Sequence, residues 1–444
     1  MIGEKIQMKK TLLLSVVTST MIMAGGDIAP AAPVEAVEEV SSWDFSGQAV
    51  AFTMTVDKFG TKSLFDRDTT YAAVGLQLRA INKDLFAGIG AGVEVSGIQQ
   101  SDNLTAIPTA SPTNPNSFAF PFFSGGDAQV QSAAITQGYL TYGFGHTLIK
   151  VGRQTLPKSL SPFAYSEGWQ MFKNTMEAAL VVNTDLPDTT LVYAAVGRAN
   201  SSIGRLDNFE DMGTRWGTAS TVTFGTVHML TAQNKSVEDL TLTGSYYYAP
   251  YANSSSQNAD IIWGDAKYKY SNFTFALQGG LLAADGLADT TAFGAKIGAK
   301  LGMFDTSVAY SSANGPLRIT NLATFQSVLP NVNIKSPLYT QMLLNNIGVH
   351  HAQDADYLKI AASTKVLGGK FGVAYGRTLE NRNIEAGTTI NAYGQNPYEI
   401  DVSYKIKVAE NWTLFGIYGY VDRDDTANIE GSNNFVRLWA RYSF

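Results

Sequence analysis

The C-terminal stretch from Phe435 to Phe444 reads FVRLWARYSF, and it decides the fold. Its residues alternate between two faces with a period of two, which is the pattern of a β-strand. One face carries only aliphatic and aromatic side chains, whereas the other includes Arg437, Trp439 and Arg441. A strand with lipid on one side and water on the other accommodates both faces, but a strand buried in a soluble core does not. The stretch therefore predicts a strand of a transmembrane β-barrel.

The same alternation recurs along the chain from Trp43 onward. A lysine or arginine that faces lipid at mid-bilayer costs about 2–4 kcal/mol, so the faces that carry bases are assigned to a wet interior. The predicted inward bases are Arg79, Lys150, Lys267, Lys269, Lys296, Lys300, Lys359, Lys405, Arg437 and Arg441. Inward carboxylates, such as Glu94, Asp265 and Asp401, are fewer. The lumen wall is therefore expected to be cationic, although the whole chain has a net charge of −6.

Short links between strands alternate with long polar links along the chain. Short links are expected near 82–84, 143–146, 185–188, 236–239, 271–272, 302–304, 367–369 and 409–411. Long links are expected at 58–70, 97–128, 154–174, 198–224, 250–259, 284–290, 313–354, 379–396 and 422–433. Outer-membrane barrels have short periplasmic turns and long external loops. The pattern predicts about 18 antiparallel strands, or 16 because region 198–225 is ambiguous, and a barrel of that size encloses an aqueous channel.

The N-terminus has the order of regions found in a secretory signal. Lys5, Lys9 and Lys10 precede an apolar run from Thr11 to Ala24, which small residues follow. We expect a signal peptide over residues 1–24, with cleavage as late as residue 36 as the alternative. Residues 25–42 are then a short linker, and residues 43–444 are a single barrel domain. An N-terminal anchor helix is the other interpretation, but the apolar run is short for a membrane span.

Composition excludes several other classes of protein. Charged residues make up 16% of the chain, below the ~25% of a typical soluble protein. No run of ~20 apolar residues follows the N-terminal region, as a helical membrane protein would require. Cysteine is absent, which excludes disulfides and thiolate metal sites. The acidic balance gives no reason to expect a nucleic-acid partner.

Several short elements lie between Val151 and Gly197: Gly152-Arg153-Gln154, Trp169, Asn174, Glu177-Ala178 and LPDTTL at 186–191. Together with LTLTGSYYYA at 240–249 and the terminal Phe444, this stretch resembles the Opr-type porins of epsilonproteobacteria, the family of the Campylobacter-type major outer membrane protein. That family is related to the substrate-selective Opr porins of pseudomonads. The resemblance implies an 18-stranded barrel, often trimeric, that passes ions and small hydrophilic solutes. The chain departs from the family at residues 155–158 (TLPK), where an acidic residue is common, so no ion preference is carried over.

Two long loops are expected to narrow the channel. The third loop, Gln154–Asn174, carries Lys158, Glu167 and Lys173, and the seventh, Ala313–Asp354, carries Arg318. Long loops with apolar residues of their own tend to fold against the protein, although an external cap is the alternative. The wall residues expected to set the field in the lumen are Arg79, Lys150, Lys296, Lys359, Arg437 and Arg441. They would orient charged solutes, or alternatively line a wide, weakly selective pore or neutralise lipopolysaccharide at the rim.

The chain ends on Tyr442-Ser443-Phe444, a pattern similar to the C-terminal signal by which the barrel-assembly machinery recognises its clients. The further expected partners are outer-membrane lipids, lipopolysaccharide, small hydrophilic solutes and other copies of the chain in a homotrimer. The predicted location is the Gram-negative outer membrane, reached through the periplasm.

Enzymatic interpretations have little support in the sequence. Only four histidines are present, and a hydrolase needs one beside a serine or a carboxylate. No cofactor or metal motif is complete, so none is expected. The interpretation favoured by the sequence is an outer-membrane porin for passive diffusion. Its rivals are a closed-lumen surface or adhesin barrel, and an outer-membrane hydrolase.

Overall fold

The computed structural model describes residues 43–57, 63–66, 69–100, 132–168, 171–200, 206–207, 209–216, 220–319, 322, 335–343, 354–382, 396–422 and 432–444. The expected signal peptide and linker, residues 1–42, lie outside the described residues. In the described part of the chain, no helix is long and apolar enough to cross a membrane.

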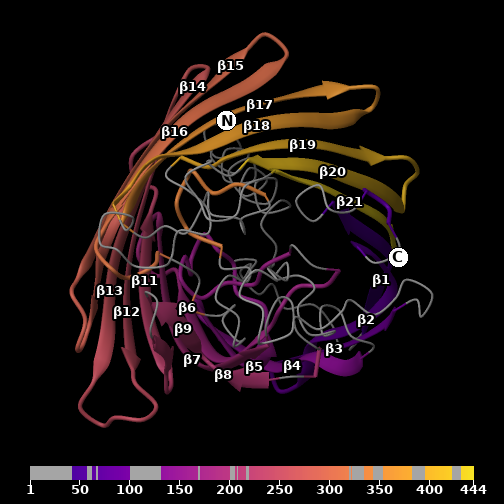
Figure 1. Cartoon of the computed structure of the whole chain (residues 1–444). Helices are drawn as coiled ribbons and strands as arrows, with labels where there is room; N and C mark the ends of the chain where they lie inside the picture. The colour runs from indigo at the N-terminus through magenta and orange to yellow at the C-terminus, as the bar shows by residue number, and fades with distance from the viewer. Residues whose placement is uncertain are drawn as a thin grey trace, which may run out of the picture.

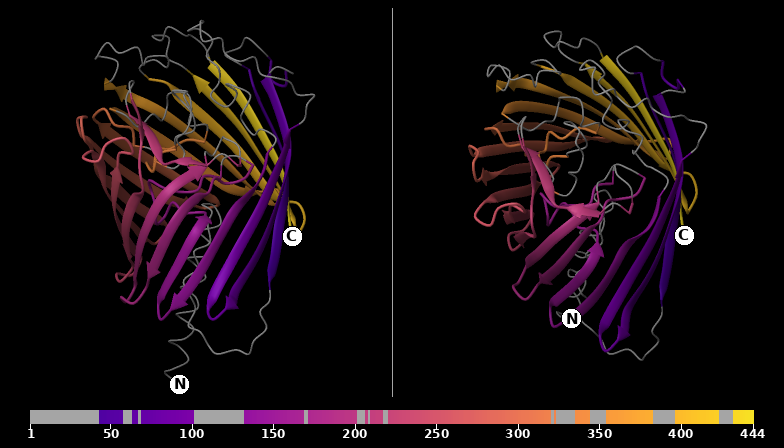
Figure 2. Two further views of the ribbon diagram at one scale, coloured as in Figure 1. Left: turned by 90° about the horizontal axis from the view of Figure 1, so that it is seen from below. Right: turned by 60° about the horizontal axis from the view of Figure 1, so that its bottom comes forward.

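Eighteen antiparallel strands form one closed ring, because the last strand, β21, pairs with the first, β1. Figure 1 shows the ring along its axis, and Figure 2 shows the strands inclined to that axis. The ring strands are β1 Asp44–Val56, β2 Thr70–Phe86, β3 Ile89–Gln100, β4 Ser132–Phe144, β5 Thr147–Gln154, β6 Met176–Asn183, β7 Thr189–Asn200, β11 Val227–Asn234, β12 Leu240–Pro250, β13 Asn258–Tyr270, β14 Phe273–Ala284, β15 Thr290–Leu301, β16 Phe304–Asn314, β17 Ala355–Val366, β18 Gly369–Asn381, β19 Tyr398–Lys407, β20 Trp412–Asp422 and β21 Ser432–Ser443. The count of 18 and the nine long links are confirmed.

Three further short strands belong to the fourth long loop: β8 (Phe209–Asp211), β9 (Gly213–Trp216) and β10 (Ser220–Thr223). Among the residues that the structure describes, β8 pairs only with the end of β7, and β9 pairs with β10 in a separate two-stranded sheet. The ring reaches 18 strands without them, so the 16-strand alternative is wrong. The region looked ambiguous because its residues have strand-like composition, yet each run is too short to span a bilayer.

The strand faces follow the predicted alternation. On β2 the outward side chains of Val74, Leu76 and Leu78 are 47–56% exposed, whereas the inward Gln77 between them is 8% exposed. The outer belt is therefore apolar, and the closed ring satisfies the backbone hydrogen bonds that lipid cannot. The interior receives the polar face of each strand.

One short link differs from the prediction. The polar run 82–84 was expected to reverse the chain, but β2 continues through Phe86 with an irregular register, and the turn falls at Ala87–Gly88. Both turn residues have positive φ, 51° and 81°, as the twist of a tight hairpin requires. Asp84 instead accepts a hydrogen bond from the Gly88 N–H at 2.9 Å and supports the turn from outside it.

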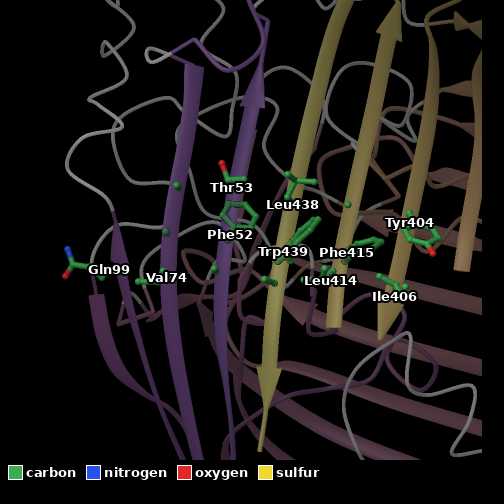
Figure 3. A pocket seen from close by; sticks show the side chains of 15 residues that line it. Phe52, Thr53, Val74, Gln99, Tyr404, Ile406, Leu414, Phe415, Leu438 and Trp439 are labelled. Carbon is green, nitrogen blue, oxygen red and sulfur yellow. The ribbon is translucent and has the colours of Figure 1, made fainter. Parts of the chain in front are cut away.

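The outer wall carries a depression of about 720 Å³ across β1, β2, β19, β20 and β21. Small residues such as Ala51, Ala72 and Gly416 line it, together with the outward side chains of Val74, Leu414 and Leu438 (Figure 3). Its lining is mainly apolar, in keeping with the lipid-facing belt.

Candidate channel constriction

The described parts of the third long loop, residues 155–168 and 171–175 between β5 and β6, lie inside the ring and are anchored on two sides of it. The first half of this loop packs Leu156, Leu160 and Phe163 into an apolar cluster with β6, β7 and β11–β13. The Phe163 ring lies edge-on to Tyr247 of β12 and Trp263 of β13, at centroid distances of 5.6 and 5.3 Å.

The second half of this loop packs Met171 and Phe172 into another cluster, with Val50, Phe52 and Met54 of β1. β1 and β13 lie on opposite sides of the 18-strand ring, because eight strands separate them in one direction and eight in the other. The loop is therefore a strut held by buried apolar contacts at both ends, and Figure 1 shows it inside the ring. Such packing makes a fixed constriction rather than a freely moving flap.

The described part of the seventh long loop, which joins β16 to β17, also lies against the inner wall. Tyr339 donates a hydrogen bond to Asp265 of β13 at 2.5 Å. The Leu343 N–H donates to Asp401 of β19 at 2.9 Å, and Lys359 of β17 donates to the Gln341 carbonyl at 2.5 Å. These contacts place residues 339–343 across the wall from β13 to β19.

The two loops meet at a junction of polar contacts, which we call the loop junction: Lys158, Tyr165 and Glu167 of the third loop with Lys335 and Ser336 of the seventh. Lys158 donates to the Ser336 carbonyl at 2.8 Å, and Tyr165 donates to the Lys335 carbonyl at 3.2 Å. Lys335 forms an ion pair with Glu167 at 3.1 Å, and both side chains are largely buried. The contacts join the loops across the lumen.

The loop junction concentrates positive charge. Burial lowers the pKa of Lys158 to about 8, against the opposing effect of Glu167. Lys335, Lys359 and Lys267 lower the pKa of Lys158 further, because an additional positive charge near them is unfavourable. The site can therefore interact with charged solutes, and the pKa of one of its lysines is about 8.

The four loop residues named from the sequence have different positions. Lys158 and Glu167 are brought together with Lys335 at the loop junction. Lys173 is half-buried at the far end of the third loop, and Arg318 is only 4% exposed at the base of the seventh. Sequence reasoning missed Lys335, because a loop has no periodicity to indicate which of its residues point into the lumen.

The predicted wall base Arg79 is neutralised by a neighbour. Its Nε and Nη2 lie 3.0 and 2.5 Å from Glu94 Oε2 on the adjacent strand β3. Thr136 and Gln137 of β4 each donate a further hydrogen bond to the same carboxylate at 2.8 Å. Glu94 is 2% exposed and is paired with Arg79, so this polar patch adds little net charge to the lumen. Its hydrogen bonds instead hold the neighbouring wall strands together.

Two other predicted wall bases, Lys150 and Lys359, also contact neighbouring groups. Lys150 lies 3.6 Å above the ring of Tyr139, and Lys359 binds the Gln341 carbonyl of the seventh loop. Lys296 and Arg441 are half-buried.

Arg437 departs furthest from the expectation that it lines water. It points inward as predicted, but it is 0% exposed and lies among the rings of Phe52, Phe435 and Trp439. Its Nη2 lies 2.9 Å from the Met54 sulfur. The neighbouring inward positions on β1 and β21 carry aromatic or aliphatic side chains, and these form the apolar cluster that covers Arg437. The sequence pattern alone assigned all inward positions to a wall in contact with water.

His228, one of the four histidines that a hydrolase could use, lies on the outer face of β11. Its Nδ1 pairs with the Tyr193 hydroxyl at 2.9 Å, and the rings of Tyr193 and Tyr248 flank it. Such aromatic surroundings are typical of a membrane-interface belt. Within the ranges that the structure describes, no three His, Asp or Glu side chains are placed to hold a metal ion.

At the chain end, the predicted insertion residues close the ring. Phe444 exchanges two backbone hydrogen bonds with Gly47, at 2.8 and 3.1 Å, and its ring packs where a side chain at Gly47 would stand. Tyr442 lies between the rings of Trp412 and Phe444, at 5.2 and 5.9 Å. Together with the β1–β21 pairing, these residues form the seam of the barrel.

No family model matches the chain, and neither does any curated protein. Solved structures do resemble it. Pseudomonas aeruginosa OpdQ superposes with a TM-score of 0.68 at 15% identity, over 91% of this chain and 99% of that one. P. aeruginosa OccK8 (OprE) gives 0.65 at 13% identity, over 91% and 98%, and Acinetobacter baumannii OccAB2 gives 0.63 at 14%, over 91% and 99%. At these identities the likeness shows the fold, which is that of the outer-membrane porins.

Proposed function

We propose that the chain is an outer-membrane porin that passes ions and small hydrophilic solutes by passive diffusion. The observation that carries the proposal is the loop junction, a cluster of charged side chains inside a closed 18-strand ring. A ring of this size is too wide for wall side chains to fill, so its conductance depends on what lies inside. Charged groups at a narrow point act on every ion that passes.

The residues proposed to govern conduction are Lys158, Glu167 and Lys335 at the loop junction, with Lys359 and Lys296 on the wall beside it. Arg79 and Lys150 are proposed to hold the wall, because each is engaged with a neighbouring strand. Lys173, Arg318, Arg437 and Arg441 are proposed to support the loops and the apolar clusters, since Arg318 and Arg437 are almost fully buried.

The test is single-channel recording of the detergent-purified protein in a planar bilayer under a KCl gradient. Stepwise currents are the expected result, and their reversal potential reports the sign of the selectivity. Barrel folding is checked by heat-modifiable gel mobility on the same preparation. A folded protein that inserts without current contradicts the porin assignment.

A closed-lumen surface barrel is the second candidate, and one observation favours it. The inward faces of β1, β20 and β21 carry apolar residues such as Val50, Phe52 and Ile417, which pack with the third loop and fill part of the lumen. Full occlusion would give no conductance, so the same recording separates the two candidates.

The partners follow from the porin proposal. The apolar belt fits outer-membrane lipid, with lipopolysaccharide in the outer leaflet and the long loops facing outward. The seam at Tyr442 and Phe444 is proposed as the signal for the barrel-assembly machinery. Membership of the epsilonproteobacterial Opr-type porins and a homotrimeric state are proposals that rest on the stretch 151–197. No enzymatic activity is proposed.

A further inference from the structure

We propose that Gly75 and Gly376 are positioning residues that seat the two constriction loops on the barrel wall. Each is an inward glycine in the middle of a strand, where glycine is less favourable than alanine because it loses more freedom on folding. Such a glycine often marks a place where another part of the structure approaches closely. The inference rests on the porin proposal only where conductance is the measurement.

Gly376 on β18 receives the seventh loop, and we call the space that each of the two glycines leaves on the wall a socket. A methyl group built on Gly376 would lie 2.6 Å from Cγ and 2.7 Å from Sδ of Met342, closer than such atoms approach each other. Met342 is 2% exposed, so its side chain has little free space into which to retreat. The methionine therefore occupies the volume that any other residue at position 376 would fill.

Two hydrogen bonds fix the loop on either side of this socket. Lys359, the register partner of Gly376 on β17, binds the Gln341 carbonyl at 2.5 Å. Asp401 of β19, on the other side, accepts the Leu343 N–H at 2.9 Å. Residues 341–343 are thus held by three adjacent strands, and the glycine is the central contact.

The socket for the third loop is Gly75 on β2. A methyl group there would lie 2.2 Å from Sδ of Met171 and 2.8 Å from the Phe172 ring. The register partners of Gly75 are Val50 and Ile98, which are 2% and 5% exposed and larger than glycine. Because Gly75 has no side chain, it leaves a hole between the larger side chains of Val50 and Ile98. The side chain of Met171 fills this hole.

The two sockets share one consequence for the channel. Residues 335–336 and 341–343 belong to one short loop segment, so the height of Met342 on the wall sets where Lys335 and Ser336 reach the third loop. Loss of either seat should separate the groups of the loop junction. The glycines therefore act through the loops and need not touch a solute.

The first experiment compares single-channel currents of Gly376→Ala with those of Gly298→Ala in the full-length protein. Gly298 is a matched control on β15, because a methyl group there meets its nearest atom, the Thr306 carbonyl oxygen, at an ordinary 3.6 Å. Gly376→Ala should replace the single main level by several levels, and Gly298→Ala should keep it. Unchanged currents in Gly376→Ala would overturn the proposal.

A compensating change separates seating from folding. The double variant Gly376→Ala, Met342→Ala removes the methionine that the new methyl group would strike, so a single main level should return. If Gly376→Ala does not fold, a folded double variant with one level still supports the socket. A double variant that also fails to fold shows that the strand itself needs glycine, and it overturns the inference.

A chemical measurement works even if the barrel does not conduct. The chain has no cysteine, so Thr340→Cys introduces a single thiol, at a position that is 0% exposed beside Met342. Labelling by a water-soluble maleimide should be slow in this variant, clearly faster when Gly376→Ala is added, and unchanged when Gly298→Ala is added. Equal labelling rates in all three would contradict the seating role, whereas silent currents with the expected rates would contradict only the porin proposal.

Discussion

Raising the pH from 7 to 9 should shift the selectivity of the channel toward cations, and Lys158 should contribute part of this shift. Burial in the loop junction lowers its pKa to about 8. An amine with that pKa is about nine-tenths charged at pH 7 and about one-tenth charged at pH 9. The groups around it are Glu167, Lys335, Lys359, Lys267 and Tyr165, and burial raises the pKa of Tyr165, so that hydroxyl stays protonated.

The size of the shift follows from the charge that is lost. A unit charge acts on an ion roughly 7 Å away in water with about 0.6 kcal/mol, and 0.1 M salt roughly halves this energy. A cation gains about 0.3 kcal/mol and an anion loses as much when the charge disappears. For the roughly 0.8 of a charge that titrates, the permeability ratio of cation to anion should rise about two- to threefold.

The assay is the reversal potential under a KCl gradient, measured in steps between pH 6.5 and 9.5. Lys158→Arg keeps the charge throughout this range and should flatten the curve near pH 8, whereas Lys158→Met should hold the high-pH selectivity at every pH. Lys150→Arg and Lys359→Arg are the controls for other titrating lysines. A curve for Lys158→Arg with the same midpoint and amplitude as the parent would refute the reasoning.

Three other changes test separate parts of the structure. Glu167→Gln removes the partner of Lys335 and should move the reversal potential toward anion selectivity; a shift toward cations would contradict the junction geometry. Trp439→Ala removes a ring packed 5.4 Å from Phe52 and 5.1 Å from Phe415, and should lower the free energy of unfolding by about 3–5 kcal/mol in urea titrations followed by gel mobility, with lipid-facing Leu438→Ala as the milder control. Leu277→Arg places a charge on the outer belt and should cost about 2–4 kcal/mol of folding in bilayers, whereas Leu277→Met should be neutral.

The sequence predicted the wall of the barrel well, because a wall strand obeys one simple rule. Lipid on one side and water on the other impose a period of two, so Val74, Leu76 and Leu78 show which face is outward without any tertiary information. Loop lengths carry a second, independent signal, and it indicated both the strand count and the ends of the strands. Neither signal predicted the short strands β8–β10, because these strands do not belong to the ring.

The interior could be predicted less well, because inward-facing does not mean water-facing. Arg437 points inward as the alternation requires, yet Phe52, Phe435 and Trp439 enclose it. Which inward residues are covered depends on where the loops dock, and docking depends on shape complementarity such as that of Met342 and Gly376. No local periodicity encodes a fit between residues more than thirty positions apart.

The seam between β1 and β21 has a consequence for the order in which the barrel forms. All other neighbours in the ring are close in the chain or separated by one loop, whereas Gly47 and Phe444 are joined by almost the whole sequence. Closing a loop of roughly 400 residues in one step would cost about 5 kcal/mol of chain entropy. Successive hairpins shorten that distance as they assemble, so the seam should be the last contact made. Until the final strand arrives, the first strand presents an unpaired edge, and a chain that lacks its last residues is left open at this edge.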